Sequence, residues 1–192
     1  MQITDIEYVL GNKKESLEDL GKINPDWLID KLKNKTGIHS RYVLDKGEDE
    51  KSLVIGACKK LLAKNDSSNI DGIIHVSQSH FSRLPTSACL IQHILKLPKN
   101  MIAFDLNQGC SGFVYGLSVA SSMMYQQDLK KILVICADTY TRYIPKNDRT
   151  SRPIFSDGAA VALLENKGNG SIGPFSFFTD GSGGELLALE NH

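Results

Sequence analysis

One cysteine stands where a thiol could act as a nucleophile. The stretch Asp105-Leu106-Asn107-Gln108-Gly109-Cys110-Ser111-Gly112-Phe113 follows an apolar run and precedes a longer apolar segment with helical spacing. It predicts a buried strand, a tight glycine turn and a helix that starts next to Cys110, with Gly112 allowing close packing at the helix start. Backbone amides at the start of a helix favour a thiolate and can stabilise the oxyanion of a tetrahedral intermediate. This is the logic of a nucleophile elbow, with sulfur in place of oxygen.

Spacing alone leaves a second interpretation of Cys110 open, because free cysteine often packs as a small hydrophobe. For the other three cysteines we expect core packing. Cys58 and Cys89 lie on apolar faces of predicted helices, and Cys136 ends a predicted buried strand. The cysteines form no CxxC pair, so their spacing predicts no zinc site.

The hydrophobic pattern predicts the elements that must position Cys110. Asn24 and Pro25 are typical of a helix start, with Asn24 as the cap. The segment 111–125 is apolar nearly all round, which predicts a helix at the centre of the structure, with Phe113 among its buried residues. Strands alternate with helices, which predicts an α/β fold with a largely parallel sheet. The pattern gives strands at 3–10, 41–43, 73–76, 101–104, 132–137, 159–164 and 172–178, and helices at 25–32, 53–62, 85–95 and 111–125.

Composition narrows the class of protein. The 192 residues are 41% hydrophobic, enough for the core of one domain spanning 1–192. Lys plus Arg and Asp plus Glu each count 22, so the chain lacks the basic excess of a nucleic-acid binder. It contains no apolar run of about 20 residues, so we expect no membrane span. No signal peptide is visible at the start, and the cytoplasm is the expected compartment.

Five segments resemble, in order, the type III beta-ketoacyl-acyl-carrier-protein synthases of the thiolase-like superfamily. The resemblance covers nearly all of the chain. It implies the N-terminal half of that fold, a layered α/β/α arrangement with a mixed, largely parallel sheet. The segments are Thr36-Gly37-Ile38 with Arg41, Pro85 to Gln92, Asp105 to Phe113, Phe155 to Ala160, and Asp180 to Leu187.

The resemblance also assigns roles to residues. Cys110 would accept an acyl group from acyl-CoA. Arg149 would stack on the CoA adenine, Trp27 would cover its other face, and Lys35 would lie near the CoA phosphates. Leu84 would cross a homodimer interface, near the strand that starts at Met101, and close the acyl pocket of the partner. Taken by themselves, Arg149 and Lys35 are typical surface cations, and Leu84 is equally an ordinary loop hydrophobe.

The sequence departs from the family pattern in a few places. The segment 26–35 is longer than the common form, which leaves the match of Trp27 open. Ser156 stands in place of a glycine, and Val161 stands where a small residue is usual. Neither change removes a reactive group.

The family's acid/base pair, a histidine and an asparagine, belongs to a C-terminal half. No histidine before the last residue fits that position. We expect His75 to be a core or cleft-edge residue and His80 to have a surface role. The chain is therefore expected to be half of an enzyme, incomplete for condensation, or a short protein completed by a separate partner.

The resemblance implies an acyltransferase of fatty acid biosynthesis. Acyl-CoA would load the cysteine, and malonyl-acyl-carrier-protein would then condense with the acyl group and release carbon dioxide. A CoA thioester is a substrate here, and neither a metal nor another cofactor is implied. The alternatives are a related polyketide, quinolone or hydroxymethylglutaryl-CoA synthase-like enzyme, or a non-catalytic module that binds acyl groups or CoA or supports a dimer.

Overall fold

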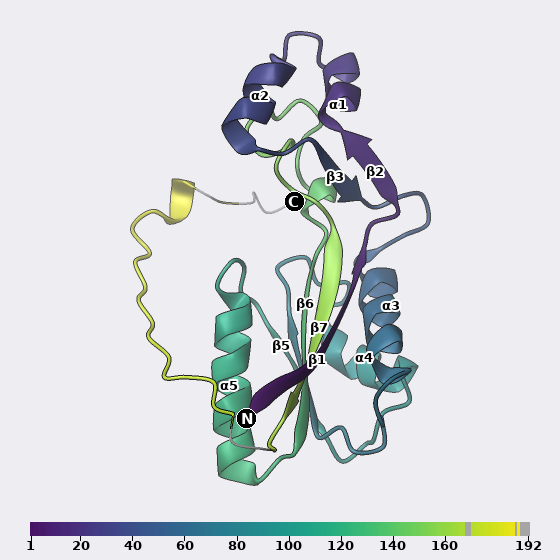
Figure 1. The fold of residues 1–192 in the computed structure, drawn as a ribbon, viewed down its shortest axis with the longest axis vertical. Coiled ribbons are helices and arrows are strands. Elements are labelled where there is room, and N and C mark those ends of the chain that lie inside the picture. The colour runs from purple at the N-terminus through teal and green to yellow at the C-terminus, as the bar shows by residue number, and fades with distance from the viewer. Residues whose placement is uncertain (168–169, 187, 189–192) are drawn as a thin grey trace.

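The computed structural model describes residues 1–167, 170–186 and 188. Its centre is a five-stranded sheet in the order β1-β7-β6-β4-β5, and a second sheet pairs β2 with β3 (Figure 1). The strands are β1 (Gln2–Leu10), β2 (Lys13–Ser16), β3 (Ser40–Val43), β4 (Gly72–Val76), β5 (Ile102–Leu106), β6 (Lys131–Asp138) and β7 (Gly158–Glu165).

Helices cover both faces of the large sheet (Figure 1). Two helices, α3 and α4, pack on one face, and α5 packs on the other, which confirms the layered arrangement expected from the sequence. The helices are α1 (Leu17–Ile23), α2 (Ile29–Thr36), α3 (Glu50–Leu62), α4 (Ser87–Ile94) and α5 (Gly112–Gln127), with 3-10 turns η1 (Tyr140–Arg142) and η2 (Gly184–Leu186).

Strand direction confirms a mixed, largely parallel sheet. β4 pairs in parallel with both β5 and β6, whereas β7 is antiparallel to β6 and to β1. Four of the five strands therefore run the same way, with β7 reversed. The crossovers through α4 and α5 place the carboxyl ends of β4, β5 and β6 at one edge of the sheet, where ligand sites of α/β folds usually lie.

The interior divides between the two faces. On one side, α3 and α4 bury a cluster that includes Leu61, Ile73 and Leu163. On the other side, α5 buries Leu117, Ala120 and other residues against β4 and β6. β4 is buried along its whole length, as expected for a central parallel strand covered on both faces.

The expectation that α5 is buried on all sides is wrong. Its apolar circumference predicted burial all round, but only one side is buried, as Leu117 and Met124 illustrate. Phe113 and Val114 are 37% and 45% exposed, respectively, because no described element covers that side.

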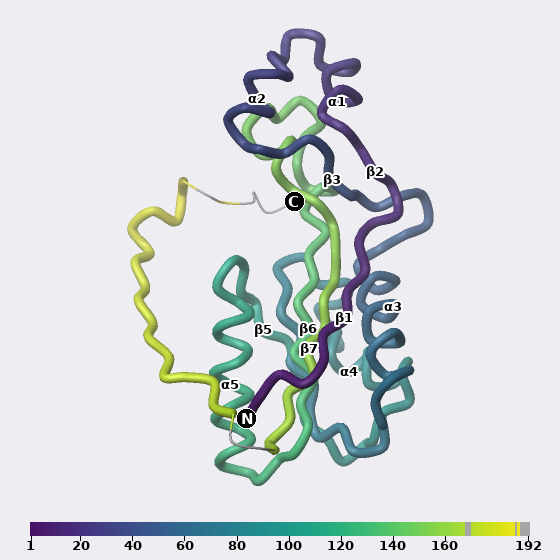
Figure 2. The backbone as a smooth tube through the Cα atoms, in the orientation of Figure 1, coloured from purple at the N-terminus to yellow at the C-terminus, as the bar shows by residue number. Residues whose placement is uncertain are grey.

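The predicted strand at 172–178 is also wrong, because these residues form no strand in the structure. Figure 2 shows this segment beside α5, where Phe177 packs on Tyr115 with ring centroids 4.6 Å apart.

A smaller unit of β2, β3, α1 and α2 lies beyond the carboxyl edge of the large sheet (Figure 1). Here the predicted helix start at Asn24 is wrong. Asn24 is instead the C-cap of α1, and both its backbone and its side chain donate to the Leu20 carbonyl. The helix α1 begins with a capping box between Ser16 and Asp19, a signal that the apolar pattern did not reveal.

Asp157 joins the small unit to the large sheet. Its carboxylate accepts hydrogen bonds from the backbone amides of Leu44 (2.9 Å) and Thr141 (3.1 Å). The neighbouring Ser156, a departure from the family pattern, accepts a hydrogen bond from the Tyr42 amide at 3.2 Å. The motif around Asp157 thus holds distant segments together, which is a structural role.

None of the helices in residues 1–167, 170–186 and 188 has both the length and the apolar character that crossing a membrane requires.

Candidate active site

Cys110 lies on the turn between β5 and α5, with its side chain exposed. The next residue, Ser111, is the N-cap of α5, yet its side chain makes no capping hydrogen bond, and the first turn contains no acidic residue. No side chain at the cap therefore competes for the amides at the start of α5. A thiol beside such amides is suited to thioester chemistry that passes through an oxyanion.

Two glycines let α5 approach the sheet closely. A Cβ atom on Gly112 would lie 2.4 Å from Val76 Cγ1 on β4, and one on Gly116 would lie 2.9 Å from Val134 Cγ1 on β6. Both distances are too short for a real contact. The sequence-based expectation that Gly112 permits close packing at the helix start is confirmed.

Two polar residues beside the nucleophile turn were missed by the sequence analysis. The Tyr140 hydroxyl donates to Gln78 Oε1, and this same oxygen would lie 2.5 Å from a Cβ atom on Gly109. Burial, assisted by the negative charges of Asp138 and of Cys110 as a thiolate, raises the pKa of Tyr140 to about 12. The phenol is therefore a neutral hydrogen-bond donor near the cysteine. Gln78 and Tyr140 follow β4 and β6, so strand order could have pointed to them.

Asp138, the last residue of β6, positions this pair. Its carboxylate accepts hydrogen bonds from the Gln78 amide at 2.9 Å and from the Ser79 hydroxyl at 3.1 Å. Burial raises the pKa of Asp138, although these hydrogen bonds oppose that effect. The contacts fix the start of the loop 77–86 against the end of β6, next to the turn that carries Cys110.

The other residues assigned from the resemblance are dispersed over the surface and the small unit. Arg149, Lys35 and Leu84 are exposed, and Leu84 is 93% exposed. Trp27 is only 6% exposed and packs with Leu17 and Leu20. Its ring contributes to the core of the small unit, so a role in covering adenine stays a prediction.

The loop that carries Arg149 does lie against the helix pair of the small unit. The Asn24 side chain donates to the Lys146 carbonyl at 3.3 Å. This junction lines a cleft of about 420 Å³. Arg149 thus lies at the same end of the molecule as Lys35 and Trp27 (Figure 1), and the role of all three at CoA stays a prediction. The cleft is lined by Lys13, Glu15, Ile23, Asn24, Lys146, Asn147 and Arg152.

The remaining cysteines have different surroundings. Cys58 is fully buried and burial raises its pKa to about 12, while burial, with a contribution from Asp138, raises the pKa of Cys136 to about 11. Cys89 was expected in the core but is exposed, because it lies on the outer side of α4. The described structure therefore exposes two thiols, Cys89 and Cys110.

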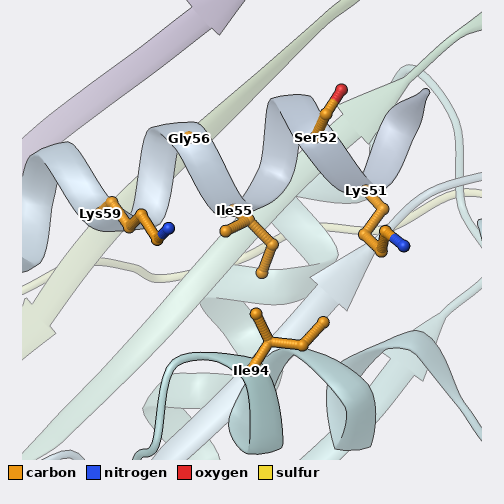
Figure 3. Close-up of a pocket in the computed structure, with 6 residues that line it drawn as sticks. All are labelled: Lys51, Ser52, Ile55, Gly56, Lys59 and Ile94. Carbon is orange, nitrogen blue, oxygen red and sulfur yellow. The ribbon is translucent and has the colours of Figure 1, made fainter. Parts of the chain in front are cut away.

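A second hollow, of about 460 Å³, lies between α3 and α4 (Figure 3). It is on the sheet face opposite α5 and has no contact with the nucleophile turn. Its lining combines two lysines and a serine with aliphatic side chains, and it contains no cysteine, histidine or carboxylate. The lining residues are Lys51, Ser52, Ile55, Gly56, Lys59 and Ile94.

Fold and site together define an α/β protein with an exposed thiol at a strand-to-helix turn, an arrangement able to form a thioester. Residues 104–181 match the family model of 3-oxoacyl-[acyl-carrier-protein (ACP)] synthase III, and this range includes Cys110. The fold also matches a crystal structure of a 3-oxoacyl-(acyl-carrier-protein) synthase III. Its TM-score is 0.90 with 36% identity, covering 97% of this chain and 56% of the other.

Curated relatives agree with this match. A beta-ketoacyl-[acyl-carrier-protein] synthase III from Syntrophomonas wolfei is 34% identical over 189 residues, 95% of this chain and 54% of the relative. A protein from Campylobacter jejuni named putative 3-oxoacyl-[acyl-carrier-protein] synthase 3 is 36% identical over 139 residues, 71% of this chain and 39% of the relative. The chain is thus similar, over nearly its whole length, to 3-oxoacyl-acyl-carrier-protein synthase III proteins. It spans about half the length of these relatives.

Proposed function

We propose that Cys110 accepts an acyl group from acyl-CoA, as the first step of a 3-oxoacyl-acyl-carrier-protein synthase III reaction. The observation that carries this proposal is the exposed thiol at the start of α5, on a family-matched turn with no side-chain cap. Gln78 and Tyr140 border the same turn and supply polar groups beside the sulfur.

In the loading step, the Cys110 thiolate attacks the carbonyl carbon of the acyl-CoA thioester. The carbonyl oxygen becomes an oxyanion, which backbone amides at the start of α5 are positioned to stabilise. The bond between that carbon and the CoA sulfur then breaks. CoA leaves as a thiolate that takes up a proton, and the acyl group remains on Cys110.

In the second step, malonyl-acyl-carrier-protein loses carbon dioxide, and its α-carbon attacks the acyl carbon on Cys110. A carbon–carbon bond forms, the thioester bond to Cys110 breaks, and a 3-oxoacyl-carrier-protein is released. This condensation needs donors to the enolate oxygen, and the resemblance assigns these to a histidine and an asparagine outside this chain. No cofactor is required besides the CoA thioester that is consumed as substrate.

We also propose that the protein acts in the cytoplasm as a homodimer in fatty acid biosynthesis. The support for the dimer is the position of β5 at the edge of the sheet, where one side of the strand pairs with no other strand of residues 1–167, 170–186 and 188. An open edge of this kind is suited to pairing with a second copy. Leu84 projects from the loop after β4, fully available for contact.

The loading step can be tested directly by intact-mass measurement after incubation with acyl-CoA. The wild-type chain should gain one acyl group, and Cys110→Ala should gain none. Cys89→Ala is the matched control, because Cys89 is the other exposed thiol of the described structure, and it should still be acylated. An adduct that persists in Cys110→Ala but disappears in Cys89→Ala would refute the assignment. No adduct on any variant would favour a non-catalytic binding module.

A further inference from the structure

Four ionisable side chains meet inside the protein on the sheet face that α3 and α4 cover. They are Glu50 at the start of α3, His75 on β4, Asp105 on β5 and His80 in the loop 77–86. The Glu50 and His75 side chains are entirely buried, whereas those of Asp105 and His80 keep 13% and 15% of their surface exposed. The cluster is therefore closed at Glu50 and borders solvent at His80 and Asp105, although His80 Nε2 itself is buried.

Distances within the cluster are short, but most of its polar atoms have no well-aligned hydrogen bond. His75 Nε2 lies 3.2 Å from Glu50 Oε1, and His75 Nδ1 lies 3.5 Å from Asp105 Oδ1. His80 Nε2 lies 3.8 Å from Asp105 Oδ2. Both His75 nitrogens, both Glu50 carboxylate oxygens and His80 Nε2 lack a hydrogen-bond partner of good geometry. Buried polar atoms of this kind require an explanation.

Asp105 differs, because its carboxylate is already held in place. It accepts hydrogen bonds from the backbone amides of Ser87 at 2.7 Å and Ala88 at 2.8 Å, at the start of α4. Each of its oxygens also has a histidine nitrogen nearby. Asp105 is thus a fixed anion, with one histidine on each side.

Charge balance calls for a cation in this cluster. No lysine or arginine of the described residues forms an ion pair with Glu50 or Asp105, and burying an uncompensated carboxylate is costly. Either a proton on His75 or a bound metal ion would supply the positive charge. His75 lies between the two carboxylates, with Nε2 3.2 Å from Glu50 and Nδ1 3.5 Å from Asp105, so the positive charge belongs at or beside this ring.

The ligand geometry suits a small transition-metal ion. One atom each from His75, His80 and Asp105 all lie within 4.8 Å of one another. Two ligands held tetrahedrally at about 2.0–2.1 Å from zinc lie about 3.4 Å apart. The observed separations are 3.5 Å from His75 Nδ1 to Asp105 Oδ1 and 3.8 Å from His80 Nε2 to Asp105 Oδ2. The two histidines thus approach different oxygens of one carboxylate, and side-chain rotations would bring three ligand atoms around one ion. Imidazole ligands select zinc and similar ions over magnesium and calcium, which prefer oxygen ligands.

We propose that His75, His80 and Asp105 form a binding site for a divalent transition-metal ion such as Zn²⁺, with Glu50 orienting His75. A carboxylate beside Nε2 favours the tautomer with its proton on Nε2 and leaves the Nδ1 lone pair free, next to Asp105. Three protein ligands leave a fourth position for water. The ion would tie the loop 77–86, which holds Gln78 beside the nucleophile turn, to β4 and β5.

Calorimetric titration of the chelator-treated chain with ZnCl₂ tests the proposal. We expect one equivalent of Zn²⁺ to bind, with an affinity about 100-fold lower in His80→Ala. Glu50→Gln should weaken binding by about 10- to 100-fold, as is typical of a residue that orients a ligand. His93→Ala is the matched control, because His93 is exposed on α4, and its affinity should equal that of the wild type.

Cobalt absorption separates this site from adventitious binding to a thiol. Co²⁺ in the proposed site should give visible bands of a tetrahedral centre without a thiolate-to-cobalt charge-transfer band, and His80→Gln should lose them while keeping its circular dichroism spectrum. A charge-transfer band from sulfur would overturn the proposal. So would equal affinity in the wild type and His80→Ala. Absence of zinc binding together with an imidazolium signal for His75 by NMR would show that a proton compensates the carboxylates instead.

Discussion

The two faces of the large sheet differ in how completely they are covered. Two helices close the α3–α4 face, where residues such as Cys58, Leu61 and Ile73 are buried. A single helix covers the other face, and β1 there exposes 55% of Ile6 and 60% of Tyr8. Cys110 belongs to the second, open face. The closed face acts as a scaffold, while the reactive group lies where further protein or ligand surface has room to bind.

The largest expected difference between the faces is in thiol reactivity. Cys58 on the closed face has a pKa of about 12, against about 8.5 for an ordinary thiol. Below pH 8, its thiolate fraction should therefore be smaller by more than about 1,000-fold, since three pKa units correspond to that factor. Iodoacetamide labelling followed by peptide mass spectrometry should modify Cys89 and Cys110 first. Labelling of Cys58 at a comparable rate in folded protein would show that this face opens readily.

Removing core volume from the closed face should cost the most stability. Leu61→Ala should lower the free energy of unfolding by about 2–5 kcal/mol, because Leu61 is fully buried and the mutation leaves a cavity. Its neighbour Leu62 is only partly buried, so Leu62→Ala should have a clearly smaller effect. Urea denaturation of the three proteins measures the difference. Equal losses would mean that the α3 side is less tightly packed than described.

On the open face, adding a methyl group at the start of α5 should also destabilise the protein. Gly112→Ala would place Cβ 2.4 Å from Val76 Cγ1, and overpacking of this kind costs about 1–3 kcal/mol. Urea denaturation should show this loss. The double variant Gly112→Ala/Val76→Ala removes the colliding methyl group, so the cost of the glycine substitution should be smaller in the Val76→Ala background. Independent, additive effects would contradict the close approach of α5 to β4.

A glycine on the closed face should respond in the opposite direction. A Cβ atom on Gly56 would meet Val9 Cγ2 at 3.4 Å, an ordinary contact. Gly56→Ala should therefore stabilise the protein by about 0.5–1 kcal/mol through the higher helix propensity of alanine. The thermal midpoint should rise accordingly. A fall in the midpoint would indicate that α3 packs more tightly against β1 than its neighbours suggest.

The smallest effect is expected on the uncovered part of the open face. Tyr8 is 60% exposed, so Tyr8→Ser should change the free energy of unfolding of the monomeric chain by about 0.5 kcal/mol or less. Val9, the next residue, points to the closed face and packs against that core. Val9→Ala is therefore the control, with a larger loss. A large effect of Tyr8→Ser in dilute protein would mean that another surface already covers β1.

Sequence reasoning located most elements of the large sheet, because their apolar periods are strong and their turns contain glycine. It placed the strand before Cys110 and the helix after it, and close packing at Gly112 was expected. It missed α1, whose short length gives little periodic signal and whose capping box was the better indicator. It also missed the pairing of Gln78 with Tyr140, because these residues meet only through the order of β4 and β6 in the sheet.

The strand β1, near the start of the chain, can form its hydrogen-bonded ladder only after β7 has been synthesised. Among the strands of residues 1–167, 170–186 and 188, β1 pairs with β7 alone, and Leu10 lies opposite Gly158. Roughly 150 residues must therefore leave the ribosome before that ladder can form. At about 5–20 residues per second, synthesis of that span takes about 8–30 s. During this time β1 has no partner strand, and its apolar residues are open to other chains. A nascent chain stalled before residue 158 should therefore associate with holdase chaperones through its first ten residues.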